Sequence, residues 1–346
     1  MLSVSQPLLE AIRGLRADLE LSDVLMAALE QRFAAEPGAL REYVRRARRL
    51  TYSSTIISCY GLVEQTVDSL LMAVAEAWNR IYPEHGDLPE SVRQQHRDLL
   101  LTCLRDRERA RTRTPPDERA VLAALALSPA DRPSLVPTAF TLSTANYRLP
   151  YVGGLLNRVG IEMGGLYHGR VDDALSKSGF ANYESFIDDL VQRRNDLAHS
   201  YGDDDIINRD LLATYVEIVA GYLLDVVRLA NLFAIKAIHD WDIEPIGMVV
   251  KTWTGRVGIR LEIDSIAVGD RVLLLKDDWC TSHEVLGLQS EGVSSDSFTY
   301  GGDPINVAAE VDLVPSKAEG CEVYILPTNW ADLTPSANKW GEPTPT

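Results

Sequence analysis

The amino-acid sequence predicts a mainly α-helical protein with a small antiparallel β-barrel at its C-terminal end. Up to about residue 242, apolar residues recur at the spacing of amphipathic helices. After Ile243, short β-branched segments alternate with residues that favour tight turns. The 346 residues also exceed the usual size of one compact domain. We therefore expect a helical domain over residues 1–242, a β-barrel over 243–328 and a loose tail over 329–346.

The helices of the first domain are predicted from apolar spacing and from the residues that interrupt it. The first helix has a 4-3-4 apolar spacing, in Leu8, Ile12, Leu15 and Leu19. Glu36-Pro37-Gly38 breaks this pattern, and a long helical pattern then runs from about Leu40 to Ile81. Further helices are expected near residues 88–111, 116–127, 150–159, 170–178, 182–199 and 204–240, with a proline-rich connection over 128–149.

The last predicted helix, from about Asp204 to Asp240, is apolar over much of its circumference. Asp203, Asp204 and Asp205 stand where acidic residues favour the positive end of a helix. The apolar residues leave little polar surface, so this helix must be buried in the bundle or against a second subunit.

The C-terminal segment predicts about six short strands. They are IGMVVKTW, GRVGIRLEI, VGDRVLLL, HEVLGLQS, PINVAAEV and CEVYIL, with glycines between them or at their edges. So many short strands in about 85 residues suggest a small closed barrel.

The charge of the chain argues against a protein that coats nucleic acid. The net charge is −16, and residues 243–346 hold 7 basic and 16 acidic side chains. Residues 1–242 hold 27 basic side chains, of which 25 are arginine, and include the basic runs 41–49 and 105–113. These runs are either solvated helix faces or contacts for an RNA backbone.

The sequence favours the cytoplasm as the location. The N-terminus lacks the basic start and unbroken apolar run of a signal peptide, and the apolar stretch 206–238 is interrupted by charged residues. The four cysteines are scattered, which suits reduced thiols inside the cell. Only Cys280 and His283 have a spacing typical of metal ligands, and one such pair cannot fill a tetrahedral site. We expect no metal, no cofactor and no membrane contact.

Residues 193–201, with the sequence RRNDLAHSY, are the most informative for function. Arg194 falls at the centre of an apolar helical stripe made by Tyr183, Phe186, Ile187, Leu190, Val191, Leu197 and Ala198. A guanidinium there needs a partner anion. Asn195 and His199 are four residues apart and share a neighbouring face, whereas Arg194 and His199 are roughly 140° apart on an ideal helix. Arg194 and His199 converge only at a helix end or between two copies of the helix.

Arg194, Asn195 and His199, followed by Tyr201, resemble the motif of HEPN ribonucleases in their prokaryotic toxin and defence branch. The segments STIISCYGLVEQTVDSLL and VDDALSKSGFANYESFIDDLVQRRNDLAH also look like that branch, so the resemblance covers about residues 45–235. It implies a HEPN-like helical bundle, a homodimer and metal-independent cleavage of RNA.

The resemblance also implies roles for the motif residues. Two copies of His199, with an unperturbed pKa near 6.5, would move protons to and from the ribose 2′-OH and the 5′-leaving oxygen. Arg194 would neutralise charge on the phosphate, with Asn195 and Arg193 in support. Tyr201 would orient His199 or be a target of adenylylation by a regulatory partner. The implied partners are RNA, for which tRNA or another translation-linked RNA is a candidate, and an antitoxin or regulatory protein.

Other interpretations of the motif remain open at this point. His199 could stand in a last helical turn because a cation suits the helix C-terminus, and Arg194 could pair with Asp188 or Glu64. The chain would then be a non-catalytic HEPN module that binds a nucleotide or nucleic acid, or an adaptor.

Residues 245–326 resemble the second domain of elongation-factor-type GTPases. The similarity lies in IGMVVKTWTGRVGIRLE, AVGDRVLLL, HEVLGLQS and GCEVYIL. The resemblance implies contact with tRNA or the ribosome, but the net charge of −9 over residues 243–346 disfavours phosphate binding. A surface that docks a protein, or a purely structural appendage, is the alternative.

Overall fold

The computed structural model describes residues 2–33, 37–105, 116–161, 173–199, 206–239, 244–276, 279–311 and 318–325. The chain divides into two compact units. One comprises Val4–Glu76 and Glu84–Arg228, and is helical. The other comprises Met1–Ser3, Ala77–Pro83 and Leu229–Thr346, and contains all the strands.

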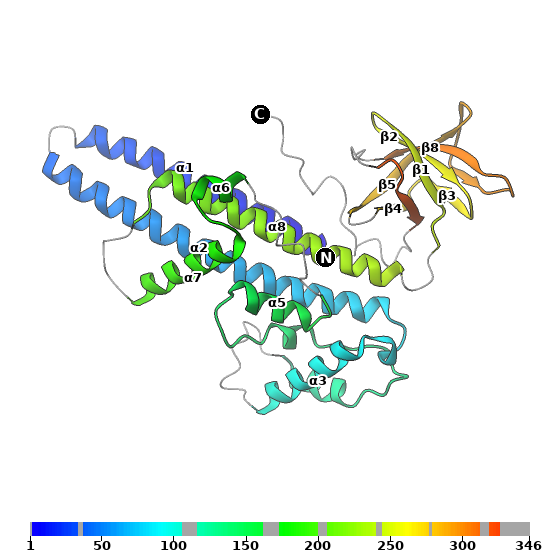
Figure 1. Ribbon diagram of the computed structural model, residues 1–346, viewed down its shortest axis with the longest axis horizontal. Helices are drawn as coiled ribbons and strands as arrows, with labels where there is room; N and C mark the ends of the chain where they lie inside the picture. Colours follow the sequence, from blue (N-terminus) through cyan, green and yellow to red (C-terminus); the bar gives the residue numbers. More distant parts are fainter. Residues whose placement is uncertain are drawn as a thin grey trace. The chain divides into compact units, whose positions relative to one another are not determined.

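Three long helices form the frame of the helical unit: α1 (Leu2–Arg32), α2 (Pro37–Ile81) and α8 (Arg209–His239). Figure 1 shows α1 and α2 as an antiparallel hairpin with α8 running along it. Arg16 on α1 forms an ion pair with Glu217 on α8 at 2.6 Å. Ser22 on α1 and Thr51 on α2 share a hydrogen bond of 2.8 Å between their hydroxyl oxygens. These contacts place α1 against both of the other helices.

The apolar face of α8 is buried within the chain itself. Its fully or almost fully buried residues include Leu212, Tyr215, Val216, Val219, Tyr222, Leu223 and Val226. The helix begins at Arg209, with Asn208 Oδ1 accepting a hydrogen bond from Leu211 N at 2.8 Å. The predicted start at Asp204 is therefore wrong, because Asn208 caps the helix and its first residue is Arg209, five residues later. Asp203 to Asp205 lie outside the described residues.

A smaller group of elements lies between α2 and α5 in the sequence. It comprises η1 (His85–Asp87), α3 (Glu90–Arg105), α4 (Glu118–Leu125) and η2 (Pro137–Thr141). Asp117 caps α4 by accepting a hydrogen bond from Ala120 N at 3.2 Å. The proline-rich connection is more ordered than expected, because η2 buries Phe140 completely.

His96 joins α3 to η2 as a buried, neutral hydrogen-bond acceptor. Its side chain is 2% exposed, its Nε2 accepts a hydrogen bond from Val136 N at 2.9 Å, and its ring stacks on Phe140. Burial lowers the pKa of this imidazole to about 4. A proton on Nε2 would also remove the bond from Val136, so the folded state favours the neutral form.

The stability of the chain should therefore fall as the pH drops from about 6.5 towards 4. Above pH 6.5, His96 is neutral in both the folded and the unfolded chain. Between pH 6.5 and 4, His96 is protonated in the unfolded chain but stays neutral in the folded chain. This difference amounts to about 3 kcal/mol of unfolding free energy at the acid end. Urea unfolding at a series of pH values should show that the unfolding free energy of His96→Gln depends less on pH than that of the natural chain. An unchanged dependence would contradict this assignment.

The remaining helices of the first unit are α5 (Leu149–Asn157), α6 (Asp173–Ser178) and α7 (Tyr183–His199). Most predicted helices are thus present, with ends shifted by a few residues. The predicted extension of α3 beyond Arg105 and the glycine-rich stretch after Ile161 lie outside the described residues.

The β unit is one antiparallel sheet with a small additional pair. Its strands are β1 (Gly247–Trp253), β2 (Arg256–Leu261), β3 (Ser265–Ala267), β4 (Arg271–Lys276), β5 (Trp279–Ser290), β6 (Val293–Ser295), β7 (Ser297–Thr299), β8 (Ile305–Val311) and β9 (Glu322–Ile325). The order is β4-β9-β1-β2-β8-β5-β6, and β4 also pairs with β5. Gly255, at φ +76°, permits the tight turn between β1 and β2. Alternate strand residues meet in a core that includes Val249, Ile259, Val272 and Val323.

The structure therefore confirms a mostly α-helical chain with an added antiparallel β region. The closer resemblance to the second domain of elongation-factor-type GTPases stays a prediction. Each predicted strand segment overlaps an observed strand, because the alternation of buried and exposed residues specifies strands locally.

Candidate functional site

The candidate site lies on α7, the helix that carries most of the predicted motif. Asn182 caps this helix, with its Oδ1 accepting a hydrogen bond from Ser185 N at 2.9 Å. The first half of α7 is anchored in the core by Tyr183, Phe186, Ile187, Leu190 and Val191, all buried. The Phe186 ring meets the Tyr215 ring of α8 at 4.9 Å between centroids. This packing fixes the direction in which the second half of α7 leaves the core.

The apolar stripe of α7 is shorter than predicted. Leu197 is half-buried and Ala198 is exposed, so the last turn of the helix has left the core. Arg194 and Asn195, half-buried at the point where the stripe ends, lie at its margin and not at its centre. The prediction that the buried stripe continues past Arg194 is wrong, because among the described residues Leu197 is only half-buried and Ala198 is exposed.

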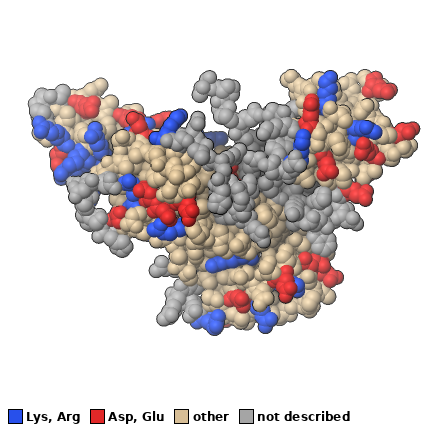
Figure 2. All heavy atoms as spheres, in the orientation of Figure 1, with Lys and Arg blue, Asp and Glu red and all other residues tan. Residues whose placement is uncertain are grey.

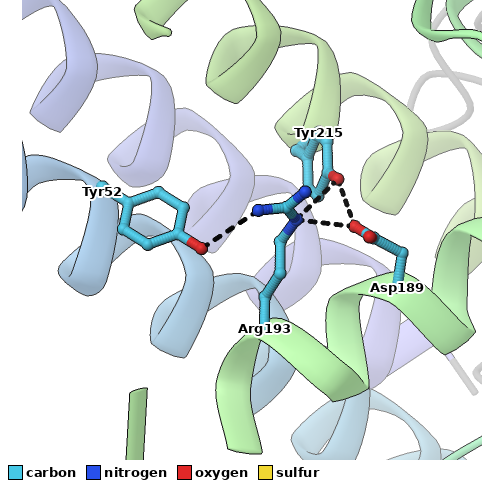
Figure 3. Close-up of polar contacts among 4 residues, drawn as sticks. All are labelled: Tyr52, Asp189, Arg193 and Tyr215. Atoms are coloured by element: carbon cyan, nitrogen blue, oxygen red, sulfur yellow. Dashed lines mark hydrogen bonds and ion pairs between the residues drawn. The ribbon is translucent and has the colours of Figure 1, made fainter. Parts of the chain in front are cut away.

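The arginine with the buried anion is Arg193, one residue earlier than expected (Figure 3). Its Nε donates to Asp189 at 2.8 Å and to the Tyr215 hydroxyl at 3.2 Å, and its Nη1 donates to the Tyr52 hydroxyl at 3.3 Å. Tyr215 also donates a short hydrogen bond to Asp189. The side chain of Arg193 is only 15% exposed and that of Asp189 31%. We call these four residues, Tyr52, Asp189, Arg193 and Tyr215, the arginine cluster.

The arginine cluster ties three helices together. Tyr52 comes from α2, Asp189 and Arg193 from α7, and Tyr215 from α8. Burial opposes the charge of Arg193, but its bonds to Tyr52 and Asp189 outweigh this and raise the pKa of the guanidinium. Burial, together with the bond to Asp189, raises the pKa of Tyr215 as well. Arg193 is therefore a permanent cation inside the fold, and its N–H donors are bonded to side chains of the fold.

Arg194 is placed differently, against an aromatic ring. Its Cζ lies 5.0 Å from the centroid of the Tyr60 ring on α2, within the range of a cation–π contact. Its Nη1 donates to Asn195 Oδ1 at 3.2 Å. In the described part of the chain, no carboxylate forms an ion pair with Arg194. The expected anion is absent from these residues, and most of the guanidinium donors are left for another acceptor.

The two carboxylates considered as partners of Arg194 are engaged elsewhere. Asp188 forms an ion pair with Arg148 at the start of α5. Glu64 interacts with the Tyr60 hydroxyl and raises its pKa, a smaller effect than that of burial. Neither of these two carboxylates neutralises Arg194 in the part of the chain that the structure describes.

Tyr60 is the residue of the site that sequence reasoning missed. It is 3% exposed, and its hydroxyl accepts a hydrogen bond from Tyr147 N at 3.2 Å. Tyr147 in turn donates to buried Asp68 at 2.5 Å. Burial raises the pKa of Tyr60 to about 12, so its ring stays neutral and rigid beneath Arg194. No local pattern links residues 60 and 194, which are brought together only by the packing of α7 on α2.

His199 is the final residue of α7. Its side chain, and the whole of Tyr201, lie outside the described residues, so the structure leaves their predicted roles as predictions. Whether the site straddles this helix end, as the motif predicts, stays a prediction. Asn195, one turn earlier, connects to Arg194 through its side-chain oxygen.

The first basic run lies on α2 near the end of the α1–α2 hairpin. Figure 2 shows blue side chains gathered at that end of the face drawn. Arg45 and Arg46 both pair with Glu42, at 3.0 Å and 2.8 Å, and all three side chains are largely exposed. These ion pairs favour the solvated helix face over a dedicated RNA contact. Of the second run, 105–113, only Arg105 is described.

Within the described ranges, no group of three or more His, Cys, Asp or Glu side chains is arranged to hold a metal ion. His283 is completely buried, whereas the side chain of Cys280 lies outside the described residues. None of the described helices combines the length and apolar character needed to cross a membrane.

Comparison with known proteins gives one result. Residues 19–235 match the family model described as MAE_28990-like HEPN. The match covers well over half of the chain and includes α2, α7 and most of α8, the helices that build the site. No curated protein and no solved structure matches the chain.

Proposed function

The chain belongs to the MAE_28990-like HEPN family, and from this premise we propose that it is a metal-independent endoribonuclease. It acts as a toxin or antiphage effector, and its active form is a homodimer. The proposed site contains Arg194, Asn195 and His199 from each of two copies. RNA is the substrate, and no metal or cofactor takes part.

One observation supports this proposal above the others: the contrast between two adjacent arginines. Arg193 donates hydrogen bonds to Asp189, Tyr215 and Tyr52. Arg194 lies over the Tyr60 ring and contacts no carboxylate among the described residues. A half-buried guanidinium without an anion is suited to bind a phosphate, which its planar fork can hold with two hydrogen bonds.

The proposed reaction is an internal transfer at one phosphodiester. The imidazole of His199 from one copy takes the proton of the ribose 2′-OH, and the 2′-oxygen forms a bond to phosphorus. The bond from phosphorus to the 5′-oxygen breaks, and that oxygen takes a proton from His199 of the other copy. Arg194 neutralises the charge that develops on the phosphate oxygens. The products are a 2′,3′-cyclic phosphate and a 5′-OH.

The test is to identify the RNA ends that the purified full chain produces from cellular RNA. We expect 2′,3′-cyclic phosphate and 5′-OH ends, formed equally well in EDTA, and none from His199→Ala. Gln192→Ala is the matched control, because Gln192 is an exposed residue of the same helix that bonds only to Asp196 among the described residues. Cleavage that stops in EDTA, or that persists in His199→Ala, would overturn the proposal.

The dimeric form of the site has its own readout. If two copies build one site, the rate per chain should rise with protein concentration until the dimer saturates. A rate per chain that is constant down to concentrations where the protein is monomeric, measured by analytical ultracentrifugation, would contradict a shared site.

A further inference from the structure

The elements around α3 form a cleft that the proposed ribonuclease site does not use. It has a volume of about 530 Å³ and is lined by α3, the end of α4, η1 and the turn at Pro129. The turn is tied to η1 by backbone bonds, from Gly86 N to Pro129 O at 2.7 Å and from His85 N to Asp131 O at 2.6 Å. Pockets of this size hold molecules up to the size of a nucleotide.

Two arginines of α3 line the cleft and form no ion pair with any described residue. Arg93 and Arg97 are four residues apart and lie on the same side of the helix. Glu90 and Asp98 also line the cleft, yet in the described part of the chain neither arginine forms an ion pair. Two neighbouring cations on one wall of a cleft make it attractive to an anionic ligand.

Two buried polar atoms at the cleft also have no partner. Arg93 Nε and His85 Nδ1 are both inaccessible to solvent and make no hydrogen bond with any described residue. Leaving a buried donor unpaired costs free energy, and such atoms are rare in folded proteins. Both atoms belong to residues that line the cleft.

From these observations we infer that this cleft binds a small organic phosphate through Arg93, Arg97 and His85. Two guanidiniums and an imidazole provide more donors, and more positive charge, than a single carboxylate requires. The apolar side chains of Leu100, Leu125 and Leu127 line the rest of the cleft and would contact the organic part of the ligand. The carboxylates of Glu90 and Asp98 are available to accept hydrogen bonds from its hydroxyl or amino groups. This inference does not depend on the proposed ribonuclease function.

The test is calorimetric titration of the full chain with AMP, inorganic phosphate and citrate as separate probes. We expect saturable binding of AMP at one site per chain, weaker binding of inorganic phosphate because it lacks an organic part, and still weaker binding of citrate. Arg93→Gln and Arg97→Gln should each weaken AMP binding at least about tenfold. Arg97 is exposed, so its replacement keeps the fold intact even if that of Arg93 does not.

Two controls separate this cleft from the rest of the molecule. Arg119→Gln removes the same charge from an exposed position of α4 that does not line the cleft, and should bind AMP as the natural chain does. Arg194→Ala should also bind AMP normally, whatever its effect on RNA cleavage. The inference is overturned if neither AMP nor phosphate binds saturably, if both cleft variants bind AMP unchanged, or if citrate binds as tightly as AMP. Binding shown only by a 5′-phosphorylated RNA oligonucleotide would overturn the assignment to a small molecule.

Discussion

Replacing Arg194 with alanine is expected to lower the rate of RNA cleavage by about 10²- to 10³-fold, the effect typical of losing one group that stabilises charge in the transition state. The guanidinium lies over the Tyr60 ring and is bonded only to Asn195 among the described residues, so its removal leaves no unpaired internal carboxylate. The thermal midpoint of unfolding should therefore change little. Single-turnover rates on one RNA substrate, measured beside the midpoint, check both parts of the expectation.

Arg194→Lys tests whether charge alone is sufficient. A lysine keeps the positive charge but lacks the planar fork that holds two phosphate oxygens, so activity should return only in part. Gln192→Ala, on the same helix, should retain full activity. If Arg194→Ala cuts RNA at the natural rate while remaining folded, Arg194 has no part in the reaction.

Replacing Arg193 with leucine is expected to have the opposite outcome, a large loss of stability. This change leaves the half-buried carboxylate of Asp189 bonded to the Tyr215 hydroxyl but with no cation beside it. Breaking a fully buried pair costs about 3–5 kcal/mol of unfolding free energy. We expect a loss near the lower end of this range, because the Asp189 side chain is 31% exposed. Chemical unfolding followed by circular dichroism measures the loss.

The double variant Arg193→Leu with Asp189→Leu should lose much less unfolding free energy than the sum of the losses in the two single variants. Removing both partners leaves no orphaned charge, so the two effects are not additive. Glu42→Gln, which breaks the exposed ion pairs with Arg45 and Arg46, is the surface control and should leave the unfolding midpoint unchanged. Equal stability of Arg193→Leu and the natural chain would show that the arginine cluster does not hold the three helices.

Together the two arginines should separate stability from activity. Arg194→Ala is expected to remain folded and lose activity, whereas Arg193→Leu, assayed at a temperature where it is still folded, should keep much of its activity. This separation follows from their partners. Arg193 is hydrogen-bonded to side chains of two other helices, whereas Arg194 forms no ion pair with a described carboxylate.

Much of the helical unit could be predicted because its signals are local. The apolar spacing of α2 and α7 and the strand alternation of β1 and β8 specify their own secondary structure. The start of α8 was predicted wrongly because two signals competed. Acidic residues favour a helix start electrostatically, but the hydrogen bond from Asn208 sets the first turn.

The sequence by itself determined most of the helices, the six longer strands, their order and the short motif around Arg194 and His199. It could not determine which arginine is buried, because Arg193 and Arg194 differ by only about 100° around the helix and both lie beside the apolar stripe. Tertiary structure decided this, by placing Tyr52 and Tyr215 from distant helices against Arg193 and the Tyr60 ring against Arg194. A helical pattern specifies which face is apolar, but only the neighbouring helices specify where that face ends and what each polar side chain at its margin meets.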